Sequence, residues 1–398
     1  MTESLTAARA LLTRHPLIDG HNDLPWRLRE ERPAGPSLVD LRERVPFTHT
    51  DLPRLARGGV SAQFWSVYVP ASLSGEAAVA ATLEQIDFVH RMIARYPDRL
   101  ELALTAADVR WIYADGKVAS LLGAEGGHSI GCSLGVLRAL YRLGVRYLTL
   151  THWANTPWAD SATDEKAAGG LTGFGREVVA EMQRLGMLVD LSHVSAGTMR
   201  DALETAAAPV IFSHSNARAR CDHPRNVPDD VLAALAANGG VCMATFVPAF
   251  VSQETCDWEL ALVAELKAGG ADPGDGDAWA AAHAERTRAE PEPVATLQQV
   301  ADHIEHIREV AGVDHVGIGG DLDGTVTLPA GLHDVTGYPA LFAELLDRGW
   351  SEADCAKLAG GNILRVLRDA EAAAREISGR REPSEARIED LDGPAAGR

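Results

Sequence analysis

The sequence predicts a single α/β domain folded as a (β/α)8 TIM barrel. Three observations lead to this prediction. Short apolar, β-branched runs recur eight times along the 398 residues, longer helical or loop segments separate them, and most of the runs end in a polar residue. Alternation of strands and helices is typical of a parallel sheet, and eight such units can close a barrel. A doubly wound open sheet is the alternative, because the number of strands is difficult to count from sequence alone.

Eight runs are expected to form the barrel strands. They lie at residues 16–21, 60–69, 118–125, 145–152, 187–193, 209–214, 240–246 and 315–321. Each is short, rich in β-branched residues and bounded by polar or glycine-containing segments, as strands are.

Two of the intervening segments have a clear helical pattern. In 76–95, apolar residues recur at steps of three and four, which is the spacing of one helix face. These residues are Val79, Leu83, Ile86, Val89 and Ile93. The second helix, "GREVVAEMQRLG" at 175–186, ends in a glycine, the residue preferred just after a helix.

Two segments fall outside the barrel rhythm. Residues 252–296 are expected to form a helical insertion between strands seven and eight, broken by the Gly/Asp/Pro cluster at 269–277. The stretch from Ser378 to Arg398 is charged and poor in large apolar residues, which predicts a disordered tail. The folded domain is therefore predicted to span residues 1–377.

Composition excludes several classes of partner and compartment. The net charge of −19 argues against nucleic-acid and anionic-membrane partners, because both require clustered Lys and Arg. The five cysteines are scattered and form no C-x-x-C pair, which argues against a disulfide framework and fits a reducing cytosol. There is no signal-peptide pattern, and no apolar stretch approaches the roughly 18 residues of a membrane span. A soluble cytoplasmic protein is predicted.

Six of the eight predicted strands end in, or just before, a residue that can bind a metal or move a proton. These residues are His21 and Asp23, Glu125, His152, His193, His214 and Asp321. The carboxyl ends of parallel barrel strands lie on one face, where active sites are built. Residues far apart in the sequence are therefore expected to converge at this face.

Imidazole and carboxylate groups are ligands of zinc, so we expect two Zn²⁺ ions at this face. His21 and Asp23 lie two positions apart on an extended chain, point to the same side, and would hold one ion. His193 and His214 would hold the other. Two ions at about 3.5–4 Å need a shared ligand, and the carboxylate of Glu125 can bridge them.

Asp321 is left without a metal in this assignment. A water bridging two metals has its pKa lowered toward roughly 7, which gives hydroxide near neutral pH. Asp321 could orient this hydroxide, take its proton and pass it to a leaving group.

Each of these residues also has a simpler structural explanation. A single histidine at a strand end is more often structural than a ligand, and Asp321 and Asp323 could merely form a turn. It is the joint pattern that favours a site. The remaining histidines lack such a pattern and are expected to be structural: His49, His90, His283, His303, His306 and His333.

Several longer motifs contain these residues. They are "DGHNDLPW", "GAEGGHSI", "LGVRYLTLTHWANTPWAD", "LVDLSHVS", "FSHSNAR", "RNVPDD" and "VGIGGDLDG". Taken in order, they resemble the zinc-dependent dipeptidases typified by renal (membrane) dipeptidase, peptidase family M19 of the amidohydrolase superfamily. The resemblance extends over nearly the whole predicted domain.

The resemblance implies the same zinc ligands and the same proton shuttle, and it adds two roles. His152 would contact the scissile carbonyl and steady the tetrahedral intermediate. Arg225, in "HPRNVPDD", would bind the C-terminal carboxylate of a dipeptide. From the residues alone, Arg225 could equally cap the start of a helix. The resemblance also implies a homodimer.

The predicted function is a binuclear zinc dipeptidase. A metal-bridging hydroxide would attack the peptide bond of a free dipeptide, including L-Xaa-D-Xaa, with Asp321 as proton shuttle. The first alternative is another metal-dependent amidohydrolase, such as an N-acyl amino acid deacylase or a lactam hydrolase. Relatives that bridge their metals with a carboxylated lysine are disfavoured, because the fourth strand ends in "LTLTH" without a lysine. The second alternative, a barrel that only binds a ligand, predicts a broken site, whereas every expected position is filled.

The sequence departs from the animal members of this family in three respects. It shows no signal peptide, lipid-anchoring tail or disulfide framework. The 252–296 segment is longer than the corresponding connection and is expected near the mouth of the barrel. The residues before Arg225, "ARCDHP", also differ. Substrate preference is therefore not carried over from those enzymes.

Overall fold

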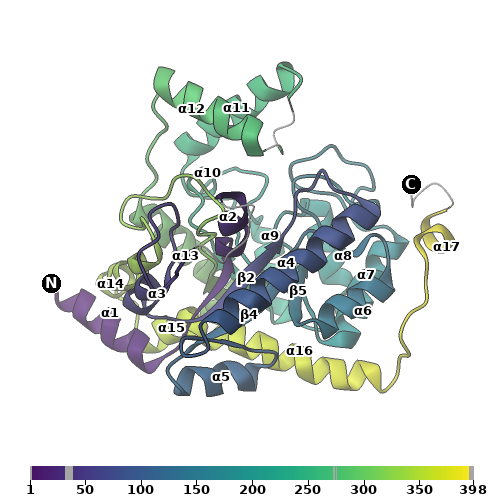
Figure 1. Cartoon of the computed structure of the whole chain (residues 1–398), viewed down its shortest axis with the longest axis horizontal. Coiled ribbons are helices and arrows are strands. Elements are labelled where there is room, and N and C mark those ends of the chain that lie inside the picture. Colours follow the sequence, from purple (N-terminus) through teal and green to yellow (C-terminus); the bar gives the residue numbers. More distant parts are fainter. Residues whose placement is uncertain (1, 32–38, 272–273, 275, 394–398) are drawn as a thin grey trace.

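The fold is a closed barrel of eight parallel strands surrounded by helices, seen in a computed structural model that describes residues 2–31, 39–271, 274 and 276–393 (Figure 1). The barrel strands are β1 (Leu17–Asn22), β2 (Val60–Tyr68), β4 (Val118–Glu125), β5 (Val145–Thr149), β6 (Leu188–Asp190), β7 (Ile211–Phe212), β8 (Val241–Ala244) and β9 (Val316–Ile318). Each pairs in parallel with its neighbours, and β2 pairs with β4 to close the ring. The predicted (β/α)8 barrel is confirmed, and the open sheet is excluded.

One short strand lies outside the ring. β3 (Leu100–Leu102) pairs with the first residues of β4, from Leu100 opposite Val118 to Leu102 opposite Ser120. The pairing of β4 with β5 begins only at Leu122. β3 therefore extends the sheet beside the part of β4 that β5 does not reach.

The helices connect the strands and cover the barrel. They are α1 (Glu3–Arg14), α2 (Leu24–Glu31), α3 (Leu52–Gly58), α4 (Gly75–Arg95), α5 (Ala106–Ala114), α6 (Leu134–Arg142), α7 (Gly173–Leu185), α8 (Ala196–Thr205), α9 (Asp229–Asn238), α10 (Pro248–Val251), α11 (Gln253–Ala268), α12 (Gly276–Ala289), α13 (Leu297–Ala311), α14 (Tyr338–Asp347), α15 (Glu352–Ala356), α16 (Asn362–Ser378) and α17 (Ile388–Asp392). None of the described helices is long and apolar enough to cross a membrane.

The two helices with clear sequence patterns are present. α7 begins at the side-chain cap of Thr172 and ends at Gly186, which adopts the left-handed conformation (φ 83°). α4 buries Ile86, Val89 and Ile93 as predicted. Leu83 is 41% exposed, because the buried stripe passes instead through the small and polar side chains on its other side, including Thr82.

The barrel interior is filled by large side chains from several strands. Phe64 and Tyr147 lie in one buried cluster with Ile18, and their rings are 5.2 Å apart. A Cβ at Gly123 would lie 1.9 Å from the ring of Tyr147, so only glycine lets this tyrosine cross the interior. The same cluster includes residues of α5 and α16, which run along the base of the barrel in Figure 1.

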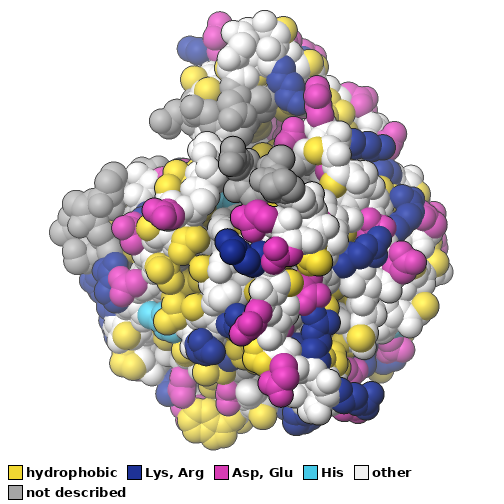
Figure 2. Space-filling view, turned by 90° about the vertical axis from the view of Figure 1, so that its right-hand side faces the viewer, with side chains coloured by type: hydrophobic (Ala, Val, Ile, Leu, Met, Phe, Trp, Pro, Cys, Tyr) yellow, Lys and Arg dark blue, Asp and Glu magenta, His cyan; other side chains and the backbone are white. Residues whose placement is uncertain are grey.

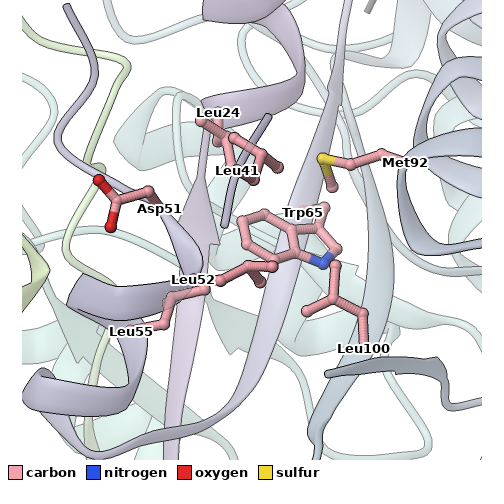
Figure 3. Close-up of a pocket in the computed structure, with 8 residues that line it drawn as sticks. All are labelled: Leu24, Leu41, Asp51, Leu52, Leu55, Trp65, Met92 and Leu100. Carbon is pink, nitrogen blue, oxygen red and sulfur yellow. The ribbon is translucent and has the colours of Figure 1, made fainter. Parts of the chain in front are cut away.

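A second apolar layer lies between the barrel and the helices. Figure 3 shows part of it, where the indole of Trp65 points out from β2 into a small apolar pocket. The pocket is lined by Leu24, Leu41, Asp51, Leu52, Leu55, Trp65, Met92 and Leu100. Both faces of β2 are buried, although the strand includes the polar residues Ser61, Gln63 and Ser66.

The segment between β8 and β9, predicted as the 252–296 insertion, contains α11 and α12. They pack on each other through a small cluster of their own, with Trp258, Leu262 and Leu266 buried and Trp279 against them. They project from the end of the barrel at which α2 and α10 follow their strands (Figure 1). Part of the predicted break at 269–277 lies outside the described residues.

Acidic and basic side chains are interspersed over the face shown in Figure 2, which carries no extended basic area.

The segment after α16 differs from the predicted disordered tail. The helix α17 packs against α7, and its Ile388 is 2% exposed. The Asp392 carboxylate accepts hydrogen bonds from the Thr172 hydroxyl (2.6 Å) and the Phe174 N–H (3.2 Å). These groups belong to the first turn of α7, where free N–H groups attract a carboxylate. One apolar and one acidic side chain thus hold a segment of otherwise polar composition, and residues 394–398 lie outside the described part.

Candidate metal centre

The predicted site residues meet at the carboxyl end of the barrel. Glu125 is the last residue of β4 and His21 lies within β1, whereas His193 and His214 follow β6 and β7 closely. All four are nearly inaccessible, with exposures between 0% for His21 and 5% for His193. Residues separated by up to 193 positions in the sequence therefore lie in one buried cluster.

One carboxylate oxygen is the centre of this cluster. Glu125 Oε1 faces the Nε2 atoms of four histidines: His193 at 3.0 Å, His21 at 3.3 Å, His214 at 3.5 Å and His152 at 3.7 Å. Two of these nitrogens, in His193 and His214, are 3.0 Å from each other. Nitrogen and oxygen atoms so close together present lone pairs to a common point, which is the arrangement that a divalent cation needs.

Two further carboxylates border His21. Its Nε2 lies 3.1 Å from Asp23 Oδ2 and 3.9 Å from Asp321 Oδ1. An irregularity in the pairing of β1 between Asp19 and Asn22 turns the end of this strand. His21 and Asp23 then point to the same side, and the Asn22 amide between them donates to Thr50 Oγ1 on the other side.

Three overlapping groups among the described residues could hold a metal ion. They are His21, Glu125 and His214; Glu125, His152 and His193; and His21, Asp23 and Asp321. In each group the candidate ligand atoms lie within 4.8 Å of one another. Glu125 belongs to two groups and His21 to two, so neighbouring ions at this site would share ligands.

Hydrogen bonds from behind direct the imidazole lone pairs inward. The Tyr147 hydroxyl donates to the Gly20 carbonyl (3.3 Å) and therefore accepts the Nδ1–H of His21 (2.7 Å). In the same way, Ser213 Oγ donates to Asp190 (2.6 Å) and accepts from His214 Nδ1 (2.8 Å). Such outer partners fix the tautomer with Nε2 free for a metal.

The charges within the cluster depend on one another. Burial opposes a positive charge on His21, but the nearby Glu125 and Asp23 carboxylates raise its pKa well above the usual histidine value. Burial would raise the pKa of Glu125, yet the charge on His21 and a hydrogen bond from Ser66 lower it. Burial first, and then the charge of Arg225, hold the pKa of His193 well below its usual range. A neutral imidazole beside ionised carboxylates is a donor set suited to zinc.

Unsatisfied polar atoms at the site support a bound cation. Within the described part of the chain, His21 Nε2 and Asp23 Oδ1 are buried without any hydrogen-bond partner. Burying such groups is costly unless a partner or a metal satisfies them. The donor set therefore fits a bound metal cation.

Two of the site residues have strained backbones. His193 (φ 67°) and Asp321 (φ 56°) adopt the left-handed region, which side chains other than glycine rarely occupy. Such strain persists only where surrounding contacts hold it, and it is concentrated at functional sites. Gly324 closes the turn after Asp321, where a Cβ would lie 2.3 Å from Asp321 Oδ1 and 2.4 Å from Asp23 Oδ2.

Arg225 is buried beside the cluster rather than at a helix start. It is 1% exposed, and it donates to Ser215 Oγ (3.3 Å) and the His214 carbonyl (3.4 Å). Its Nε has no partner among the described residues, and its guanidinium lies 5.1 Å from the Phe250 ring centroid. Burial lowers the pKa of Arg225 to about 10, so the group is still charged at neutral pH. Because the cap of α9 is Pro228, the alternative role of Arg225 as a helix cap is excluded.

His152 lies on the side of the cluster that is bordered by the half-buried aromatic side chains of Tyr68, Trp26 and Trp153. Its ring lies 4.2 Å from that of His193 and 5.0 Å from that of Tyr68. Trp153 is next in sequence, and Trp26 stacks edge-on against Tyr68 at 5.0 Å. The His152 Nδ1 has no hydrogen-bond partner in the described chain.

Sequence reasoning missed the supporting residues. Tyr147, Ser213 and Asp190 lie inside runs that were read only as strands, although a buried carboxylate in "MLVDLSH" was a usable signal. His49 is expected to be purely structural, yet its Nδ1 accepts a hydrogen bond from the N–H of Asp323 (3.0 Å), two residues after Asp321. By contrast, His303 satisfies the Ala217 N–H (3.2 Å), as a structural histidine does.

Comparison with known proteins identifies the family that this chain resembles. A family model described as membrane dipeptidase (peptidase family M19) matches residues 5–381. Dipeptidase verJ of Clonostachys rogersoniana is 41% identical over 388 residues, covering 95% of this chain and 90% of its own. Human dipeptidase 3 is 44% identical over 386 residues, covering 95% of this chain and 70% of its own.

Solved structures agree in fold and family. The probable dipeptidase PvdM of Pseudomonas aeruginosa superposes with a TM-score of 0.81 at 25% identity, over 93% of this chain and 99% of that one. A metallo peptidase of Rhodobacter sphaeroides, liganded with a phosphinate mimic of the dipeptide L-Ala-D-Ala, gives 0.74 at 28% identity over 89% and 99%. The barrel, the buried cluster of histidines and carboxylates and the match over nearly the whole sequence lead to one assignment: this chain belongs to the membrane dipeptidase family, peptidase family M19, and is a metallo-dipeptidase.

Proposed function

We propose that this chain hydrolyses free dipeptides with two zinc ions held around Glu125. The observation that supports this most directly is the convergence of four imidazole nitrogens within 3.7 Å of Glu125 Oε1. A single ion would use only part of this donor set. Two ions sharing Glu125 use the donors on both sides of it.

The ligands divide naturally into two sets. His21 and Asp23 form one set, with 3.1 Å between Nε2 and Oδ2. His193 and His214 form the other, with 3.0 Å between their Nε2 atoms. Glu125 Oε1 lies within 3.5 Å of the nitrogens of both sets and would bridge them. When bound, the two ions would polarise the peptide carbonyl and supply hydroxide near neutral pH.

Asp321 is placed to move the proton. Its Oδ1 lies 3.9 Å from His21 Nε2, so the carboxyl group borders the space between the ligands. Burial and the negative charges of Asp23 and Glu125 raise the pKa of Asp321 well above its usual value. A raised pKa favours the protonated carboxyl group, which can deliver its proton to the leaving amine.

Arg225 and His152 would hold the substrate. Arg225 is a buried cation whose hydrogen-bond partners among the described residues are a hydroxyl and a backbone carbonyl rather than a carboxylate, and a carboxylate is the group that fits its planar fork. It therefore suits the C-terminal carboxylate of a dipeptide. His152, across the cluster, would steady the oxyanion that forms at the scissile carbonyl.

A D-residue at the C-terminal position is proposed to be accepted. The Rhodobacter sphaeroides relative was crystallised with a mimic of L-Ala-D-Ala. The barrel of this chain superposes on it over 89% of its length, which supports a similar pocket for the C-terminal residue.

The experiment is amino-acid release by the zinc-reconstituted protein from matched L-L and L-D dipeptides, with N-acetylated dipeptides as controls. We expect cleavage of the free dipeptides only, in both stereochemical series. Cleavage of the acetylated set would instead establish a deacylase, the alternative from the sequence. Cleavage of the L-L series alone would refute acceptance of a D-residue.

The cytoplasmic location and the homodimer are predictions from the sequence and the family resemblance. Light scattering coupled to size-exclusion chromatography tests the second. A mass of about twice 42.4 kDa would support the dimer, and a mass of 42.4 kDa would contradict it.

A further inference from the structure

The turns that carry Asp23 and Asp321 are joined to each other by backbone hydrogen bonds. Asp23 N–H donates to the Leu322 carbonyl (2.9 Å), and Asp321 N–H donates to the His21 carbonyl (3.2 Å). Asn22 and Leu322 form a parallel bridge between the two turns. Any displacement of the Asp321 turn is therefore transmitted to Asp23.

This double turn is strained and needs contacts that hold it. Asp321 (φ 56°) and Asp323 (φ 69°) both adopt the left-handed conformation, two residues apart. Neither residue is glycine, so the conformation is unfavourable unless the surroundings enforce it. The backbone bond from Gly324 N–H to the Asp321 carbonyl is long (3.3 Å) and closes only one side of the turn.

A reciprocal pair of hydrogen bonds fastens the other side. The Asp323 carboxylate accepts the His49 backbone N–H (2.5 Å), and the Asp323 N–H donates to the His49 imidazole Nδ1 (3.0 Å). Asp323 is 8% exposed, so water competes little for these bonds. Thr50, the residue after His49, accepts a hydrogen bond from the Asn22 side chain (2.9 Å). The same short loop thus holds both turns from behind.

The loop itself is a rigid support. Arg54 donates to the Thr48 carbonyl (2.7 Å) and to the Asp51 carboxylate (2.7 Å), and all three residues are buried. Asp51 also caps α3 by accepting the Arg54 N–H (2.9 Å). The loop is therefore anchored to a helix, and it can impose its geometry on the double turn.

We propose that Asp323 and His49 are positioning residues, which fix Asp321 facing Asp23 and His21 across the site. The inference rests on the proposed function only where Asp321 is taken as the proton carrier. Neither Asp323 nor His49 touches the substrate or the metals in this proposal. They act by holding the carboxyl group of Asp321 where it borders the reacting atoms.

Two pairs of variants test this proposal. Asp323→Ala and His49→Ala each remove one partner of the reciprocal bonds. Asp323→Asn keeps a carbonyl oxygen for the His49 N–H, and His49→Asn keeps an acceptor near the position of Nδ1. We expect the alanine variants to lower kcat by about 10- to 100-fold, the effect of misplacing a catalytic group by about 1 Å, with little change in KM. The asparagine variants should restore most of the lost kcat.

His315→Ala is the matched control. His315 also fastens a loop, through its Nδ1 and the Gly240 carbonyl (2.8 Å), but at the opposite end of β9. It should keep the wild-type kcat. The proposal is overturned if Asp323→Ala keeps the wild-type kcat, or if its kcat falls no further than that of His315→Ala.

A cobalt titration separates this proposal from the proposed function. If the wild-type protein cleaved no dipeptide, the proposed function would fail, and the cobalt affinity would then decide the present inference. Because Asp23 moves with the double turn, Asp323→Ala should bind one of two Co²⁺ ions more weakly than the wild type, and Asp323→Asn should recover the affinity. Unchanged binding of both ions in Asp323→Ala would then contradict the inference.

Discussion

At the scale of single residues, Glu125 determines what the site can bind. A carboxylate that is 4% exposed must be compensated, since a buried unpaired charge costs several kcal/mol. Its Oε2 accepts a hydrogen bond from the Ser66 hydroxyl (3.1 Å), whereas among the described residues its Oε1 faces four imidazole nitrogens. Burial holds the pKa values of His193 and His214 well below the usual range, so their lone pairs repel Oε1, whereas a cation between them attracts both.

Asp321→Asn is the first prediction at this scale. The amide has nearly the same shape, but it cannot carry a proton to the leaving amine. We expect both metals to be retained and kcat to fall by about 10²- to 10⁴-fold, the usual contribution of a general acid or base. Metal content by atomic absorption and steady-state kinetics would check this.

The control for this substitution is Asp314→Asn. Asp314 pairs with Lys357 (2.7 Å) just before β9, at the end of the strand opposite to Asp321. Its kcat should equal that of the wild type. Wild-type turnover in Asp321→Asn would show that another group carries the proton.

Arg225→Ala is the second prediction. Losing a charge-assisted hydrogen bond to the substrate carboxylate costs about 1.5–3 kcal/mol, so KM should rise by about 10- to 150-fold. The comparison is made with dipeptides whose C-terminal carboxylate is replaced by an amide. For these amides, wild type and Arg225→Ala should have similar KM values. An equal effect of the substitution on both substrates would argue against the carboxylate contact.

How far single residues can be predicted from sequence depends on where they lie. The side chains at strand ends, such as His193 and Asp321, were found because all parallel barrel strands end at one face. Tyr147 could not be found in this way, since its hydroxyl reaches His21 across the barrel only because Gly123 leaves room. That contact depends on three-dimensional packing, which sequence spacing does not record.

At the scale of secondary structure, the barrel strands were recognisable as short segments that alternate with helical or loop segments. All six residues of β1 are buried, and so are the first eight of β2, yet both strands contain polar residues, among them Asp19, His21 and Gln63. β3 was missed because only three residues pair at the edge of the ring. The tail was misjudged because the two side chains that hold α17 are a small part of a polar segment.

Ile388→Ala tests the attachment of this tail. Truncating a buried isoleucine costs about 2–5 kcal/mol, so α17 should detach from α7 for a much larger fraction of the time. Trypsin should then cleave after Arg381 and Arg387 more rapidly by about 30-fold or more, since cleavage follows the open population. Leu391→Ala is the matched control, because Leu391 lies in the same helix but is 48% exposed. Equal cleavage of the two variants would show that Ile388 does not hold the tail.

At the scale of the whole molecule, the site connects strands from around the entire ring. Glu125 and His21 come from strands on either side of β2, and His193 and His214 come from the opposite part of the barrel. Metal ions bound at the centre would therefore crosslink segments that are distant in sequence. Any ligand that binds only the folded chain stabilises it, by about 4 kcal/mol at a concentration 1,000 times its dissociation constant.

Metal removal is the prediction that follows for the whole molecule. The chelated protein should keep its far-UV circular dichroism at room temperature, because the apolar layers of the barrel do not depend on the metals, but it should unfold at a lower Tm. Added zinc should restore the Tm.

Protons compete with zinc for His21, whose pKa the neighbouring carboxylates raise well above its usual value. The affinity for zinc should therefore fall as the pH falls. Glu125→Gln, which weakens the bridge, should show a smaller difference in Tm between the chelated and the zinc-loaded forms. Equal Tm values for chelated and zinc-loaded wild type would contradict a metal centre at this end of the barrel.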